Sequence, residues 1–202
     1  MNVLNSWVDR AYWRTKSVIW REEDRHFHAV LSTRTPEWGH ADTGAAIAHI
    51  RSKDLVHWEH LPPLIALGRK FYHCEVPDIF EMDGRWYVTF CTISSGGIKI
   101  HTPYREEVTG VLYMTAGQFD GPYALLDDPL LVGAGHGKMT AYSSGSVSYE
   151  GGRVLYHHIA GERPSCGAPK RMRTGEDGAM WLEYLPAMER LETGVIREDF
   201  DN

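Results

Sequence analysis

The chain has 202 residues, 43% hydrophobic and 24% charged, which fits a folded globular protein with one sizeable core. Its net charge of −6 and pI near 6.0 argue against nucleic-acid or anionic-membrane binding, which needs clustered Lys and Arg. The three cysteines are widely spaced and predict neither a disulfide framework nor a metal site, and we expect no cofactor.

The start of the chain lacks the basic residues and long apolar run of a signal peptide. No apolar run elsewhere approaches membrane-spanning length. We therefore expect a cytoplasmic protein, or an extracellular one if the chain has lost its own beginning.

Along the chain, four segments share an acidic or Gly-rich turn followed by an aromatic and aliphatic strand, and each is typical of a hairpin entering a central strand. They are residues 23–31, 83–90, 150–158 and 176–184. Two further segments, 52–58 and 118–123, place an acidic turn ahead of an aromatic residue. Sustained helical periodicity is absent, because Pro186 interrupts the best candidate at 182–191.

This repeated pattern predicts an all-β fold, and specifically a β-propeller. The step from Asp24 to Asp83 has about the length of a four-stranded blade with a long loop. We predict a single propeller-like domain over 1–202, apparently incomplete, with about four blades. The predicted blades cover approximately 12–62, 72–125, 136–170 and 171–200.

The stretch most suggestive of chemistry places Glu75 and Asp78 on either side of Pro77. It precedes the Asp83-Gly84 turn and the aromatic strand 86–90. A carboxylate on a rigid strand edge beside an aromatic hairpin suits acid–base chemistry on a sugar.

Residues 75–80, Glu-Val-Pro-Asp-Ile-Phe, resemble the Glu-Cys-Pro-Asp-hydrophobic-Phe motif of glycoside hydrolase family 32. This family of invertases, levanases and fructanases shares a five-bladed propeller with arabinanases and xylosidases. Residues 47–58 are similar to the group's blade-ending Ser-x-Asp-Leu-x-x-Trp, and 119–123 to its Gly-Pro-aromatic strand. Residues 185–191 resemble its Leu-Pro-Arg-Glu-Leu segment. These pieces occur in the family's order and match only its later blades, so the resemblance implies a propeller lacking the first blade.

The resemblance gives Glu75 the role of general acid/base. A retaining glycosidase also needs an ionised carboxylate as nucleophile. The family's nucleophile motif, Asn-Asp-Pro-Asn, is absent, and Asp9 lies in a different context. The family also has an Arg-Asp-Pro motif, which corresponds to residues 14–16 of this chain. Arg14 matches its Arg, whereas Thr15 and Lys16 replace the Asp and the Pro.

Glu75 thus lacks its expected partners. An inverting route through water would need another carboxylate facing it. Glu37 and Asp42 are candidates only because their loop lies nearby in the chain.

Other residues have both a binding and a structural interpretation. Asp78 is a ligand for a sugar hydroxyl or an Arg, or else a turn former. Trp38 is a sugar-stacking platform or a loop anchor. Residues 136–142 are similar to a fourth-blade segment of the family, so His136 or Tyr142 contacts substrate, or the segment is a Gly-rich loop.

The histidines allow a metal hypothesis as well. His26 and His28 share one strand face, and His157 and His158 lie in a matching later strand. No third ligand lies at a suitable spacing for a metal. We therefore interpret these histidines as ring side chains that fill space between the strands, and we predict no metal site.

Together these features predict a glycoside hydrolase-like protein acting on fructosyl- or arabinosyl-type bonds. The alternatives are a non-catalytic carbohydrate-binding propeller and a propeller interaction module. The expected partner is a carbohydrate, with no nucleic acid and no membrane. A propeller lacking a blade exposes strand edges, so we also expect a second copy, or a partner that supplies the blade.

Overall fold

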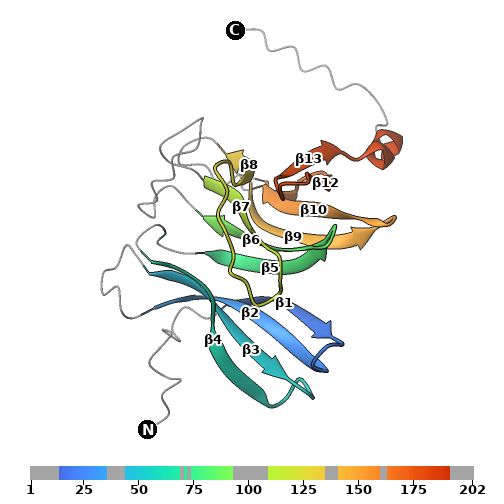
Figure 1. Ribbon diagram of the computed structural model, residues 1–202. Helices are drawn as coiled ribbons and strands as arrows, with labels where there is room; N and C mark the ends of the chain where they lie inside the picture. The colour runs from blue at the N-terminus through green and yellow to red at the C-terminus, as the bar shows by residue number, and fades with distance from the viewer. Residues whose placement is uncertain are drawn as a thin grey trace.

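The computed structural model describes residues 14–35, 44–68, 71, 74–92, 109–134, 141–159 and 163–191. Antiparallel strands make up about two-thirds of this part of the chain and form three sheets (Figure 1). The predicted all-β architecture is confirmed. Within the described ranges, no helix has the length and apolar character needed to cross a membrane.

The first sheet has the order β1-β2-β3-β4, so each strand pairs with the next one along the chain. The predicted turn at 22–25 joins its first two strands, and the predicted turn at 52–58 joins its last two. In that second turn, the Asp54 carboxylate accepts hydrogen bonds from the backbone N–H groups of Val56 and His57. The strands are β1 (Arg14–Arg21), β2 (His26–Arg34), β3 (Ala45–Ser52) and β4 (Trp58–Gly68).

The second sheet repeats this layout as β5-β6-β7-β8. Asp83 and Gly84 form the two-residue turn between β5 and β6, and their φ angles of 51° and 73° are both positive, as a type I′ hairpin requires. The segment 118–123 again lies between the third and fourth strands. The strands are β5 (Glu75–Met82), β6 (Arg85–Thr92), β7 (Thr109–Ala116) and β8 (Leu130–Ala134).

In the third sheet, β10 pairs with β9 along one edge and with both β11 and β12 along the other. β11 and β12 pair with successive parts of that edge of β10, as one strand with a break would. β12 then pairs with β13 on its other side. A short 3-10 helix, η5 (Pro186–Leu191), follows. The strands are β9 (Tyr142–Tyr149), β10 (Gly152–Ile159), β11 (Ser165–Cys166), β12 (Lys170–Thr174) and β13 (Met180–Tyr184).

The strand boundaries differ from the predicted blades. β4 extends to Gly68, past the predicted end at 62, and β8 lies outside the predicted 72–125 although it pairs with β7 in the second sheet. Segments 136–170 and 171–200 were expected to be separate blades, yet their described strands hydrogen-bond in one sheet. The reason is the turn at 175–179. It has the same kind of sequence as the turns that open the other sheets, but it joins the third and fourth strands of this one. That residues 1–202 form one domain stays a prediction.

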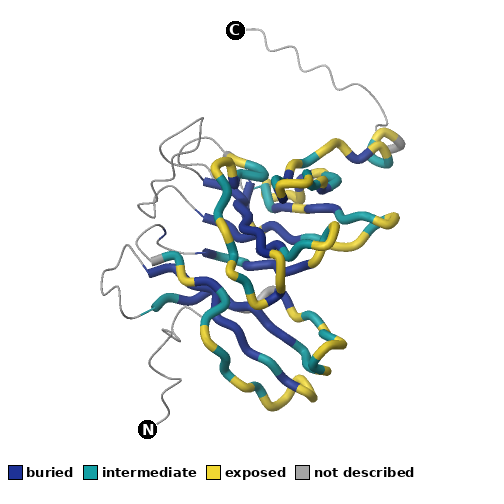
Figure 2. The backbone as a smooth tube through the Cα atoms, viewed as in Figure 1, coloured by how far each residue is buried: buried dark blue, intermediate teal, exposed yellow. Residues whose placement is uncertain are grey.

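The sheets stack face to face, with β1, β5 and β9 side by side and running in the same direction (Figure 1). Side chains alternate across a strand, so one face of the second sheet packs on the first sheet and the other face packs on the third sheet. Val88 lies in the cluster shared with the first sheet, which includes Val30 and Ile47. Tyr87 lies in the cluster shared with the third sheet, which includes Leu155. These buried layers run between the sheets in Figure 2.

Candidate functional site

Glu75 is the first residue of β5, and Tyr142 is the first residue of β9. Since β1, β5 and β9 run in the same direction, their first residues lie at one edge of the stacked sheets (Figure 1). Arg14 begins β1 and therefore lies at this edge too. The side chain of Arg14 is outside the described part of the structure.

A bulge in β5 decides where the Glu75 and Asp78 side chains point. Glu75 pairs with Cys91 and Asp78 with Thr89, so two residues of β5 lie opposite one residue of β6. The extra residue is accommodated by Val76, whose φ of 52° is positive, and by Pro77. Residues three apart on a regular strand face opposite ways, but the bulge restores both carboxylates to the face that packs on β9.

The Tyr142 hydroxyl donates a hydrogen bond of 2.5 Å to Oε2 of Glu75. The Tyr142 ring is buried in the cluster between the second and third sheets, so its hydroxyl position is fixed by packing. Glu75 itself is half-buried. The result is a carboxylate held in place by a buried tyrosine at the edge of the sheets. Acid–base chemistry needs a side chain positioned in this way.

Asp78 lies deeper along the same seam. Its Oδ2 accepts hydrogen bonds from the Ser146 backbone N–H at 2.9 Å and from the Ser146 hydroxyl at 2.6 Å. Arg153 in turn donates from Nε to the Ser146 hydroxyl at 2.7 Å and stacks over the Phe80 ring. Burial lowers the pKa of Arg153, and the nearby Asp78 charge opposes that shift. This network joins β5 to β9 and so helps to fix the position of Glu75 on the same strand.

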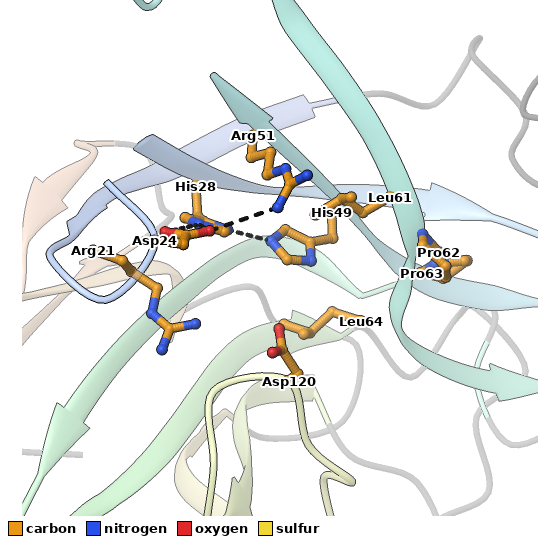
Figure 3. Close-up of a pocket in the computed structure, with 10 residues that line it drawn as sticks. All are labelled: Arg21, Asp24, His28, His49, Arg51, Leu61, Pro62, Pro63, Leu64 and Asp120. Atoms are coloured by element: carbon orange, nitrogen blue, oxygen red, sulfur yellow. Dashed lines mark hydrogen bonds and ion pairs between the residues drawn. The ribbon is translucent and has the colours of Figure 1, made fainter. Parts of the chain in front are cut away.

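A second polar cluster lies at the opposite edge, where β1 ends and β2 begins (Figure 3). His28 Nε2 is 2.9 Å from Oδ2 of Asp24, and His28 Nδ1 is 2.7 Å from Nε2 of His49. Burial, together with nearby positive charge, lowers the pKa of His49 to about 4. Burial alone raises the pKa of Asp24, but the His28 hydrogen bond and neighbouring cations lower it overall.

The sequence interpretation did not find this cluster. It singled out His26 and His28 as a possible metal pair but did not connect them with His49. Only the register of β2 against β3, in which Val30 pairs with His49, brings the two rings together. Among the described residues, no three metal-ligating side chains converge on a common point.

Comparison with known proteins gives matches in structure only, since neither a protein-family model nor a curated protein matches this sequence. A Bombyx mori GH32 β-fructofuranosidase superposes with a TM-score of 0.67 over 96% of this chain, at 15% sequence identity. Bacillus subtilis levansucrase gives a TM-score of 0.65 over 84% of the chain at 13% identity. An inulosucrase from Halalkalicoccus jeotgali gives 0.66 over 85% at 13% identity.

The chain has the fold of the GH32-like propeller glycosidases. The predicted resemblance is therefore confirmed at the level of fold. The three sheets are propeller blades, and β1, β5 and β9 are their inner strands. The chain spans 42%, 48% and 50% of the lengths of these three neighbours, about half of each.

The structure brings together only some of the predicted propeller site. Glu75, Asp78 and Tyr142 share the seam between the second and third blades. Thr15, where the resemblance expects a carboxylate, pairs with Leu31 in the first blade. Several candidates fall outside the described residues, namely Asp9, Glu37, Trp38, Asp42 and His136.

Proposed function

We propose that this propeller is a glycoside hydrolase-like protein that acts on fructosyl- or arabinosyl-type bonds, with Glu75 as general acid/base. The observation that carries the proposal is the Glu75 carboxylate, held by Tyr142 where the inner strands of adjacent blades begin. The structural neighbours named above are a β-fructofuranosidase, a levansucrase and an inulosucrase, which favours a fructosyl group.

In this proposal Glu75 protonates the oxygen of the departing group, and Tyr142 fixes the angle of approach. A retaining enzyme places its second carboxylate about 5–5.5 Å from the first, and an inverting enzyme about 6.5–9.5 Å, leaving room for water. Arg14, Trp38 and His136 stay predicted substrate contacts beside Tyr142. Asp78 also stays a predicted substrate contact. Its hydrogen bonds to Ser146 hold β5 against β9.

One observation favours a second candidate, a non-catalytic carbohydrate-binding propeller. Thr15 has a hydroxyl where the resemblance implies a transition-state-stabilising carboxylate. A hydroxyl still hydrogen-bonds a sugar but supplies no negative charge to a developing oxocarbenium ion. This candidate predicts sugar binding at the Glu75 edge without turnover.

The test is hydrolysis by the wild-type protein and by Glu75→Gln, compared on sucrose and on a p-nitrophenyl furanoside. Loss of a general acid lowers rates by about 10²–10⁴-fold when the leaving group needs protonation. Nitrophenolate leaves with little protonation, so we expect a large loss on sucrose and a much smaller loss on the nitrophenyl substrate. Glu81→Gln is the matched control, because Glu81 is an exposed carboxylate on the same strand.

Equal losses in the Glu75 and Glu81 variants, or unchanged turnover in Glu75→Gln, would contradict the acid/base role. Sugar binding with no wild-type turnover on either substrate would contradict hydrolysis and support the non-catalytic candidate.

A further inference from the structure

A pocket of about 350 Å³ lies between the first blade and the β7–β8 connection, at the edge opposite Glu75 (Figure 3). One wall is the apolar segment Leu61–Leu64 in the middle of β4. The remaining lining is polar and includes Arg21, Asp24, His49 and Asp120. Its volume is at the lower end of the range of small-molecule sites.

The hydrogen-bond chain from Asp24 sets which atom His49 offers to this pocket. A carboxylate only accepts hydrogen bonds, so His28 Nε2 carries the proton that bonds Asp24. His28 Nδ1 and His49 Nε2 share the proton of the 2.7 Å contact between them, so Nε2 of His49 is already engaged. Nδ1 of His49 is left as the ring nitrogen that can hydrogen-bond a ligand hydroxyl. Figure 3 shows this second ring nitrogen directed away from His28, on the side of Leu64 and Asp120.

Arg21 and Asp120 supply a donor and an acceptor. The Arg21 guanidinium lies 4.2 Å from the centre of the Phe119 ring. Its Nε makes no hydrogen bond within the described residues and lies 3.4 Å from Oε2 of the exposed Glu23, a long ion pair. Although Arg21 and Asp120 line the same pocket, no ion pair within 4.0 Å joins them in the described structure.

The charges around the pocket cancel, because two arginines, Arg21 and Arg51, stand against two aspartates, Asp24 and Asp120. A site with no net charge gives little attraction to an anion or a cation. It does offer hydrogen-bonding groups at His49, Asp120 and Arg21, and an apolar wall. A ring that carries several hydroxyls on an apolar carbon frame complements all of these at once.

We propose that this pocket is a second ligand site, which binds a neutral polyhydroxylated molecule of monosaccharide size. One hydroxyl hydrogen-bonds His49 Nδ1, a second donates to the Asp120 carboxylate, and a third accepts from Arg21. The C–H face of the ring packs on Leu61–Leu64. This site is separate from the Glu75 edge and does not depend on the function proposed for it.

The test uses saturation-transfer NMR and titration with D-fructose and myo-inositol as probes, with L-leucine and phosphate as charged comparators. Asp120→Ala removes the carboxylate acceptor in an exposed turn, where unfolding is not expected, and His49→Leu removes the imidazole. We expect at least tenfold weaker inositol binding in both variants. Asp127→Ala, at an exposed position in the same connection, is the control and should bind as wild type does.

Glu75→Gln separates the two sites and should leave inositol binding unchanged. The proposal is overturned if neither polyol binds, or if binding is insensitive to Asp120→Ala. It is equally overturned if binding falls only in Glu75→Gln, or if leucine or phosphate binds with the same dependence in place of the polyols.

Discussion

Two carboxylates three residues apart face the same neighbouring strand because of the backbone between them. The sequence of Glu75-Val76-Pro77-Asp78 indicated an acid at Glu75 and a ligand or turn former at Asp78, but it did not indicate that both face β9. That depends on a bulge, which in turn depends on a positive φ at Val76, a residue type that seldom adopts it. The pairing of Tyr142 with Glu75 likewise joins positions 67 residues apart. Such a contact follows from packing between blades, and no local pattern encodes it.

At His49 the structure predicts a loss of stability in acid. The folded pKa of about 4 lies below the usual value of 6.5, so between these values the unfolded chain binds a proton that the folded chain does not. Stability therefore falls as pH falls through this window, by about 3 kcal/mol in total. The groups around His49 are His28 and Asp24 from the first hairpin, Arg21 of β1 and Arg51 of β3.

Urea unfolding at pH 7 and pH 4.5 measures this loss. His49→Gln should remove much of the difference between the two pH values, whereas His158→Gln, on the third blade, should keep it. A pH dependence identical in wild type and His49→Gln would show that His49 does not titrate as stated.

At the scale of elements, hairpins were predictable and blade boundaries were not. The turns at 22–25, 83–84 and 150–151 each join the first two strands of a sheet, as their acidic and glycine residues indicated. The turn at 175–179 has the same chemistry and joins β12 to β13. Turn residues specify backbone angles, and the first and last hairpins of a blade need the same angles. Turn chemistry therefore does not tell which strands of a blade a hairpin joins, and only strand pairing decides this.

The contact between β7 and β8 depends on Gly110. A Cβ at this position would lie 2.3 Å from the Val132 carbonyl oxygen and 2.9 Å from Gly133 Cα, so the strands would have to separate. We expect Gly110→Ala to destabilise the protein by about 2–3 kcal/mol, as overpacking does. Thermal and urea unfolding measure the change.

Gly117→Ala is the control, because a Cβ there meets nothing within 4 Å. It should change stability by less than about 1 kcal/mol. Equal effects of the two substitutions would show that the β7–β8 contact tolerates a side chain.

At the scale of the whole molecule, three described blades leave two outer faces, one on the first sheet and one on the third. Ser17 and Ile19 of β1 pack toward the second sheet, so the alternate residues Val18 and Trp20 point the other way, and they are 45% and 41% exposed. On β13 of the third blade, Trp181 is 46% exposed. Large exposed apolar side chains on strands favour association with another chain.

We accordingly propose that the chain self-associates or binds a partner through these faces. Sedimentation velocity should show a dimer at micromolar concentration, and Val18→Ser with Trp20→Ser should shift it toward monomer. Leu55→Ser, at an exposed turn position, is the control and should not. A wild-type protein that sediments as a monomer at all concentrations would contradict self-association.

The proposed function requires that the Glu75 edge of this propeller binds a sugar. The most direct measurement is a crystal structure of the Glu75→Gln variant grown with sucrose, since this change slows turnover while keeping the shape of the site. We predict a fructosyl ring within hydrogen-bonding distance of residue 75 and of the Tyr142 hydroxyl. Crystals with an accessible edge and no sugar there, or with sucrose bound only elsewhere, would contradict it.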